Sequence, residues 1–304
     1  MRFNQFFLIA IFTALAALAA PATAKTQVVM LGTGTPIPIP DRSGPGVAIV
    51  VDDTPYIVDF GPGIIRRAAA ASTEYGGTVE GLRVDNIGTA FLTHLHHDHS
   101  SGLPDLVFTS WTHGRKAAFE LYGPEGIDKM ARHVLEAYAA DNRYRLYGLE
   151  PATANGWKIN AHTVDEGVVY TDDLIKVEAF RVRHGAWPNA FGYRFTTPDK
   201  VIVISGDTAL DKKVEEYATG ADILIHEVFS EAGVAKRPPF WQTYHRDNHT
   251  SSYELGELAS RAKPGLLILY HILLFGADEE SILNEVREKY DGKVILANDL
   301  DVFE

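Results

Sequence analysis

Short runs of β-branched and other apolar residues recur along the chain and predict strands. The predicted strands cover residues 27–31, 47–51, 56–60, 87–93, 119–122, 174–182, 201–205, 223–226, 266–270 and 294–297. Segments of helical character lie between several of them, at residues 63–71, 103–109, 127–140, 211–217, 253–262 and 279–290. Strands and helices interspersed on this scale indicate a layered α/β fold with more than one sheet.

Polar residues that can carry chemistry come directly after four of the predicted strands. His94 follows residues 87–93, and the other three, in chain order, are His184, Asp207 and His271. Side chains at strand ends converge because the loops there meet at one edge of a rigid sheet. We therefore expect these four side chains to contribute to one site.

The densest chemical signal is the segment Thr93-His94-Leu95-His96-His97-Asp98-His99. Neutral imidazole and carboxylate are suitable ligands for zinc and neighbouring metals when thiolate is absent. In an extended segment His94, His96 and Asp98 share one side, and His99 reaches them only if the chain turns. Such a loop can supply two adjacent metals; the alternative is a surface cluster of histidines without metal.

The first 24 residues resemble a secretory signal peptide. Arg2 supplies a positive start, residues 6–20 form an apolar run, and Ala22-Thr23-Ala24 is a small-residue cleavage site. Cleavage after Ala24 would leave a periplasmic or secreted protein without a stable membrane anchor. An uncleaved anchor is the alternative, but the apolar run is short for spanning a bilayer.

After the signal peptide, no Pro/Gly/Ser-rich linker, low-complexity run or short repeat divides the chain. Layered α/β folds often fill such a length as one unit, so we expect residues 25–304 to form one domain.

Composition narrows the chemistry further. The formal net charge is −12, and it becomes −13 when Arg2 leaves with the signal peptide. A strongly acidic surface repels phosphate backbones, which argues against a nucleic-acid binder. The chain has no cysteine, so disulfides, thiolate catalysis and Cys-ligated zinc are all excluded.

The segment His94-x-His96-x-Asp98-His99 resembles the signature of the metallo-β-lactamase superfamily, and the later residues follow in that superfamily's order. The resemblance spans residues 25–304 and implies a four-layer αββα sandwich with a dinuclear site between the sheets. It implies that the first metal binds His94, His96 and His184, that the second binds Asp98, His99 and His271, and that Asp207 bridges both. Without this pattern, His184 and His271 alone would be weak candidates.

Several further motifs resemble the ribonuclease Z and arylsulfatase-like branch of that superfamily. They are Leu31-Gly32-Thr33-Gly34-Thr35-Pro36, Asp41-Arg42-Ser43-Gly44, Asp59-Phe60-Gly61-Pro62-Gly63, Leu121-Tyr122-Gly123-Pro124-Glu125-Gly126, Ile225-His226-Glu227 and His249-Thr250. The family's tRNA-gripping arm lies between the residues that match His184 and Asp207, where this chain has only 22 residues. With the arm missing, the chain acidic and the signal peptide present, we expect tRNA not to be a partner.

The resemblance also implies a mechanism. Two metals would share a water, lower its pKa and hold the resulting hydroxide as nucleophile. Asp98 would orient that hydroxide, and His249 is the candidate proton donor to the leaving group. Glu227 would orient His249 or balance its charge; alternatively, His226 and Glu227 form a buried pair that orients other groups.

Residues 236–246 mix aromatic and cationic side chains in an expected loop just before His249. One hypothesis is that this segment overhangs the site and holds an anionic, partly apolar substrate, with Arg237 and Arg246 as the cations. The alternative is a structural loop that packs Phe240 and Trp241 on the core.

The sequence therefore predicts a secreted dinuclear hydrolase of a small phosphodiester, sulfate ester or related ester. The metals would be two divalent ions per chain, Zn²⁺ first, with Mn²⁺ or iron as alternatives. A lactonase or other carboxylic-ester hydrolase is the nearest rival, and a non-catalytic metal-binding protein is the rival of another class. Related enzymes are often dimers, so a homodimer is compatible with the resemblance.

Overall fold

The computed structural model describes residues 24–150 and 152–304. The predicted signal peptide, apart from Ala24, lies outside the described residues. Within the described part of the chain, no helix combines the length and the apolar character needed to cross a bilayer.

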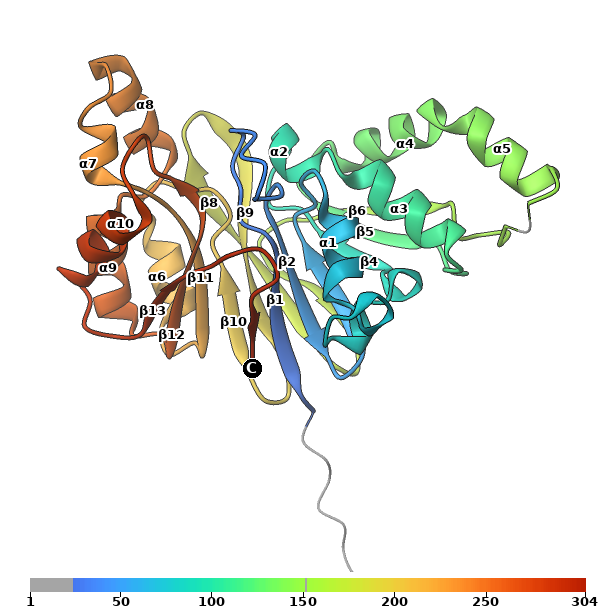
Figure 1. Cartoon of the computed structure of the whole chain (residues 1–304), viewed down its shortest axis with the longest axis horizontal. Helices are drawn as coiled ribbons and strands as arrows, with labels where there is room; N and C mark the ends of the chain where they lie inside the picture. The colour runs from blue at the N-terminus through green and yellow to red at the C-terminus, as the bar shows by residue number, and fades with distance from the viewer. Residues whose placement is uncertain (1–23, 151) are drawn as a thin grey trace, which may run out of the picture.

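Two seven-stranded sheets form the centre of the described residues (Figure 1). The order in the first sheet is β14 (Val302–Phe303), β1 (Thr26–Gly32), β2 (Gly46–Val51), β3 (Thr54–Val58), β4 (Thr89–Phe91), β5 (Phe119–Gly123) and β6 (Ile159–Thr163). The order in the second is β13 (Val294–Leu296), β12 (Leu266–Leu273), β11 (Ile223–Phe229), β10 (Val201–Ile204), β9 (Trp187–Thr196), β8 (Lys176–His184) and β7 (Gly167–Thr171). Both sheets are mixed, because β3 to β6 and β10 to β13 run parallel while the remaining pairs are antiparallel.

Helices cover the outer face of each sheet. The first sheet carries α1 (Ile64–Ala71) and α3 (Leu103–Thr112), and the second carries α6 (Lys212–Ala218), α9 (Ser252–Ala262) and α10 (Glu279–Arg287). The remaining helices are α2 (His97–Ser100), α4 (Ile127–Ala137), α5 (Ala139–Tyr147), α7 (Glu231–Val234) and α8 (Pro239–Asn248). Short 3₁₀ turns occupy Thr73–Tyr75, Glu80–Leu82 and Val84–Asn86.

Three apolar clusters hold these layers together. The cluster between the sheets contains Tyr56 and Phe91 from the first and Tyr193 and Ile225 from the second, all buried. Two further clusters lie between each sheet and its helices. The layer order is thus helix, sheet, sheet, helix, which confirms the predicted αββα sandwich.

The structure also contains elements that the sequence pattern did not predict. Strands β6, β7, β9 and β14 were missed, and the predicted helix 127–140 is divided into α4 and α5, which extends to Tyr147. Strand β9 was obscured by Pro188 and Gly192, which disfavour strands. Gly192 belongs there because a Cβ would meet the Phe180 ring on the neighbouring strand.

The expected loop at residues 236–246 is wrong for most of its length. Helix α7 precedes it, and α8 begins at Pro239. Proline is favoured in the first turn of a helix because its missing N–H has no partner there. The rest of α8 is mostly polar, so its apolar periodicity was too weak to predict the helix.

Candidate metal centre

The His-rich segment begins just after β4 and turns into α2. His94, Asp98 and His99 are buried, His96 is half-buried, and His97 is exposed. The α2 turn supplies the change of direction that His99 needs to reach the other ligands. The structure therefore brings together the four predicted ligands of this segment and leaves out only the histidine that had no predicted role.

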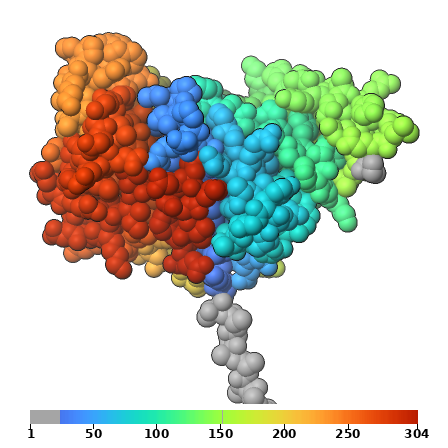
Figure 2. Space-filling view, in the orientation of Figure 1, coloured from blue at the N-terminus to red at the C-terminus, as the bar shows by residue number. Residues whose placement is uncertain are grey.

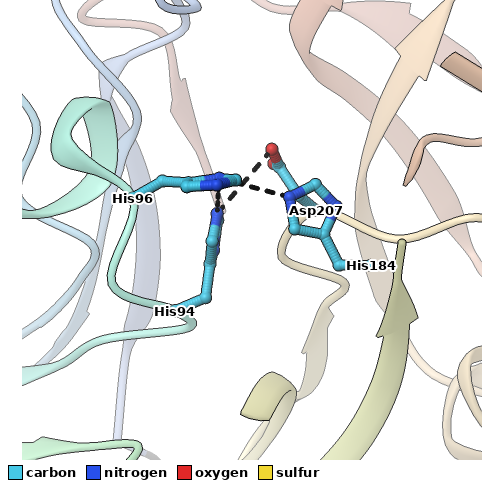
Figure 3. A group of neighbouring side chains, drawn as sticks. All are labelled: His94, His96, His184 and Asp207. Carbon is cyan, nitrogen blue, oxygen red and sulfur yellow. Dashed lines mark hydrogen bonds and ion pairs between the residues drawn. The ribbon is translucent and has the colours of Figure 1, made fainter. Parts of the chain in front are cut away.

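One group of potential ligands combines His94 and His96 with His184 and Asp207 from the second sheet (Figure 3). His96 Nδ1 lies 2.9 Å from His94 Nε2 and 3.2 Å from His184 Nε2, and Asp207 Oδ2 lies 4.0 Å from His94 Nε2. Ligands around a tetrahedral zinc ion at 2.0–2.1 Å are separated by about 3.3 Å. These four side chains therefore point at one position with spacings suited to a metal ion.

A second group contains Asp98, His99 and His271. Asp98 Oδ2 lies 3.5 Å from His99 Nε2 and 3.4 Å from His271 Nε2. The two oxygens of Asp207 also face this group, with Oδ1 3.4 Å from His99 Nε2 and Oδ2 3.6 Å from His271 Nε2. Asp207 thus lies between the two groups, in the position that a bridging carboxylate requires.

His271 is presented by an irregularity in β12. The sequence placed it after the strand, but the strand continues to Leu273. Glu227 pairs with Tyr270 and Val228 with Ile272, so His271 is an extra residue in the ladder, and its φ is 45°. A β-bulge of this kind redirects a side chain, and here it turns His271 towards Asp98.

Asp59 supports the second group and was missed as a functional residue. Its carboxylate accepts hydrogen bonds from Thr93 N at 2.8 Å and Thr93 Oγ1 at 2.9 Å, and it lies 2.8 Å from His99 Nδ1. Such a contact fixes the tautomer and direction of a ligating imidazole. The predicted strand 56–60 contained Asp59, whereas β3 ends at Val58, so Asp59 in fact comes directly after a strand, as the other ligand-type residues do.

Helix α8 gives His184 a similar support. The Asn248 carbonyl oxygen lies 2.8 Å from His184 Nδ1, which leaves His184 Nε2 facing His96. Gly185 N donates to Asp247 O at 3.0 Å, so the end of α8 is fixed to the turn after β8.

The electrostatics of the site fit a metal ion. Burial and the neighbouring histidines lower the pKa of His94 well below its usual range and that of His96 to about 4, so both imidazoles are neutral and able to ligate. Burial opposes charge on His99, but Asp207 and Asp59 outweigh it and raise the pKa of His99 well above its usual range. The carboxylates of Asp59 and Asp207 therefore favour a positive charge beside His99.

Two orphaned atoms support the same fit. Within residues 24–150 and 152–304, His99 Nε2 and Asp207 Oδ1 are buried and have no hydrogen-bond partner. Buried polar atoms are rarely left unpaired in folded proteins. Both atoms belong to the groups described above, so bound cations would satisfy them.

The predicted proton donor and its partner lie beside this centre. His249 Nδ1 is 3.3 Å from Glu227 Oε1 and 3.9 Å from Asp207 Oδ2. Glu227 is completely buried and also accepts from Thr208 N and Thr250 N. Burial lowers the pKa of His249 to about 4, whereas burial and Asp207 raise the pKa of Glu227 well above its usual range. The geometry places His249 beside Glu227 at ion-pair distance, although His249 Nδ1 has no hydrogen-bond partner among the described residues.

Two cavities open on the centre. One, of about 450 Å³, is lined by Asp98, Asp207, His249 and His271, with Arg237, Trp241 and Phe275 among its other walls. The second, of about 660 Å³, is lined by Arg183, Trp187 and Phe240, among others. His96, His184 and Tyr244 line both. We call them the His249 lobe and the Trp187 lobe.

The cations of residues 236–246 lie in different places. Arg237 lines the His249 lobe, as the substrate-binding hypothesis requires. Arg246 pairs with Glu231 instead and lies over the Phe229 ring, 5.8 Å from its centroid. The part of the hypothesis that concerns Arg246 is therefore not supported by its position. Figure 2 shows the loop between β1 and β2, in blue, on the surface beside α7 and α8, in orange. Pro36 and Ile37 of this loop line the His249 lobe.

A four-layer αββα sandwich with this His/Asp constellation between its sheets is the architecture of a metal-dependent hydrolase. Residues 54–272 match the beta-lactamase superfamily domain, and the chain belongs to that superfamily. The predicted resemblance is confirmed at this level.

Individual relatives are consistent with this assignment to the superfamily. The ribonuclease Z of Mycobacterium bovis (strain BCG / Pasteur 1173P2) is 28% identical over 279 residues, which cover 90% of this chain and 96% of the relative. The crystal structure of the short form of human tRNase Z aligns with a TM-score of 0.68 at 21% identity, over 91% of this chain and 98% of that one. The metallo-beta-lactamase fold protein YhfI from Bacillus subtilis gives the same TM-score at 18% identity, over 92% and 100%.

Proposed function

We propose that this chain is an exported dinuclear hydrolase of a small phosphodiester, sulfate ester or related ester. The observation that carries the proposal is the convergence of seven His and Asp side chains beside two open cavities. The similarity to ribonuclease Z favours a phosphodiester within this set.

A small substrate suits the segment between His184 and Asp207. In the described structure, this segment forms the turn after β8, strand β9, a short connection and β10, which all belong to the second sheet. It therefore supplies no projecting arm with which to hold a folded RNA. The acidic charge of the chain works in the same direction.

The two ligand groups would hold two divalent ions, with Asp207 between them. Such ions supply an activated water and polarise an oxygen of the substrate. Zn²⁺ is our first choice because His and Asp are its usual ligands in the absence of cysteine, although Mn²⁺ and iron accept the same donors.

The side chains of the protein would do the remaining work. Asp98 Oδ2 lies between His99 and His271, where it can accept a proton from a nucleophilic water and orient it. His249 would donate a proton to the leaving oxygen, and Glu227 would hold the His249 ring through Nδ1. In this role His249 is catalytic and Glu227 is a positioning residue.

The experiment that tests the proposal is elemental analysis of the purified protein, combined with turnover of bis(p-nitrophenyl) phosphate and an aryl sulfate before and after chelation. We expect about two metal ions per chain and hydrolysis that chelation abolishes. His271→Ala should lose bound metal, whereas His133→Ala should not, because His133 is on the surface, 56% exposed, and outside both ligand groups.

Less than one metal per chain after reconstitution, with no turnover, would favour the non-catalytic alternative. N-terminal sequencing of the exported protein tests the location separately, since the proposal requires a mature chain that begins at Lys25.

A further inference from the structure

The two lobes beside the metal centre differ in which reacting groups they contain. Asp98, Asp207 and His249 line only the His249 lobe. A proton donor must lie within hydrogen-bonding reach of the oxygen that it protonates. The leaving group of the proposed hydrolysis therefore belongs in the His249 lobe.

The remaining substituent of the substrate then has one place to go. It stays bonded to the reacting centre, and it cannot occupy the space beside His249 that the leaving group fills. His96 and His184 line both lobes, so a reacting centre held there connects them. The retained substituent accordingly enters the Trp187 lobe.

Three large aromatic side chains, Trp187, Phe240 and Tyr244, line the Trp187 lobe beside polar residues that include Arg183 and Asp247. The Trp187 ring packs against His96, with 4.5 Å between ring centroids, so the ring is fixed beside a candidate metal ligand. Phe240 and Tyr244 reach the lobe from α8 and are 71% and 39% exposed. Large aromatic side chains clustered around a concave surface are typical of ligand sites. The volume of about 660 Å³ is enough for a ring system with its own substituents.

We propose that the Trp187 lobe binds a planar aromatic or heteroaromatic group on the part of the substrate that is retained after hydrolysis, with Trp187 as the stacking residue. This inference rests on the proposed function and specifies its substrate class. In the reaction, the water oxygen bonds to the reacting centre and the bond to the leaving oxygen breaks. The leaving oxygen takes its proton from His249, and Asp98 accepts the proton of the water. Exchange with solvent then returns a proton to His249 and removes the one on Asp98.

Two esters with the same leaving group test the assignment. p-Nitrophenyl phenylphosphonate and p-nitrophenyl methylphosphonate both release p-nitrophenolate, and they differ only in whether the retained group is an aromatic ring. We expect the metal-loaded protein to prefer the phenyl ester, and Trp187→Ala to lower the phenyl-to-methyl ratio of kcat/KM by about tenfold. Trp157→Ala is the matched control, because Trp157 is also a half-buried tryptophan but lines neither lobe.

Binding of the products gives a second readout that needs no turnover. Calorimetry should show that phenylphosphonate binds the metal-loaded protein more tightly than methylphosphonate, and that Trp187→Ala removes the difference.

The outcomes separate this proposal from the proposed function. If the unmodified protein hydrolyses both esters and Trp187→Ala leaves the ratio unchanged, the lobe assignment is wrong and the hydrolase stands. A fall in the ratio with Trp241→Ala instead would place the retained group in the His249 lobe and overturn the assignment in the same way. If neither ester is hydrolysed, the proposed function fails for phosphonate esters, and the calorimetric preference alone decides whether the lobe binds aromatic groups.

Discussion

Asp59 is not a candidate metal ligand, but it can fix the orientation of one, His99. Its carboxylate is buried, contacts Thr93 twice and faces His99 Nδ1. Its φ of 58° lies in the left-handed region, which a non-glycine residue adopts at an energetic cost. The conformation is maintained because these contacts hold the carboxylate between the two chain segments.

Replacement of Asp59 by Asn should weaken metal binding without removing a ligand. The amide no longer attracts the His99 N–H with a full charge, so we expect metal affinity to fall by about 10- to 100-fold. Competition with a chromogenic chelator measures the change. Asp105→Asn, on α3, serves as the control, and equal affinity in the two variants would show that Asp59 does not position His99.

The role of His249 should appear as a dependence on the leaving group. His249→Asn removes the proposed proton donor, so an ester whose leaving group is unsubstituted phenol should lose about 100-fold or more in kcat. A p-nitrophenyl ester should lose less, because its leaving oxygen needs less help from an acid. His133→Asn should change neither rate. A uniform loss across both esters would indicate that His249 is structural.

At the scale of single residues, the sequence predicted most of the candidate site because ligand-type residues directly after strands are easy to recognise. The seven predicted side chains all lie in the two ligand groups. The bulge at His271 was not predictable, since no turn residue marks it and its neighbours Tyr270 and Ile272 continue the apolar run. Asp59 was missed because its motif was interpreted as a family resemblance and not as a supporting contact.

Among the elements, α8 contributes most to the site beyond the sheets. It separates the two lobes with Tyr244 and fixes His184 through the Asn248 carbonyl. Its mostly polar sequence hid the helix, because its aromatic side chains face a cavity and not the core. Apolar periodicity reports burial, so an element that lines an open site gives a weak signal.

Strand ends that present ligands also depend on close packing. Gly206, after β10, has a φ of 61°, and a Cβ there would lie 2.8 Å from Phe191 O and 2.9 Å from Thr93 Cβ. Gly220 has a similar φ of 69° but nothing within 4 Å of its Cβ position. Comparing substitutions at these two glycines therefore separates the energetic cost of the left-handed backbone from the cost of steric crowding.

Gly220→Ala should lower the free energy of unfolding by about 1 kcal/mol, the cost of a side chain in the left-handed region. Gly206→Ala should cost about 1 to 3 kcal/mol more, because crowding is added, and it should also reduce metal content by displacing Asp207. Urea unfolding of the metal-free variants and elemental analysis measure the two effects. Equal destabilisation by both changes would rule out the crowding argument.

In the whole molecule, the layered fold was predictable because every layer leaves an apolar pattern. The edge strands β6, β7 and β14 were not, since they are short and only partly buried. One contact near such an edge joins the two sheets. Asp172, in the turn after β7, accepts from the Tyr56 hydroxyl of β3 at 2.5 Å and from the Tyr170 hydroxyl at 2.8 Å.

This contact should make stability depend on pH. Burial acts to raise the pKa of Asp172, but hydrogen bonds from Tyr56 and from the backbone of Ile175 and Leu174 outweigh it, so the pKa is lowered. Because the folded pKa lies below the unfolded value of about 3.9, the stabilisation is present above that value and is lost as the pH falls through the folded pKa.

Asp172→Asn should therefore be less stable than the unmodified protein at pH 7, and the gap should close below about pH 4. Urea unfolding at several pH values measures it. Asp173→Asn, the next residue in the same turn, should show no such gap. A gap for Asp172→Asn that persists at acidic pH would mean that packing, and not the charge, is responsible.

The candidate metal ligands are divided between the sheets: His94, His96, Asp98 and His99 follow β4, and His184, Asp207 and His271 come from the second sheet. Neither half of the sandwich therefore carries a complete site, and the centre exists only while the two halves are docked. We expect heat or mild denaturant to loosen the packing between the sheets before the strands within each sheet are lost. Hydrolysis would then stop before secondary structure is lost, so activity would report the integrity of the junction earlier than any measure of folded content.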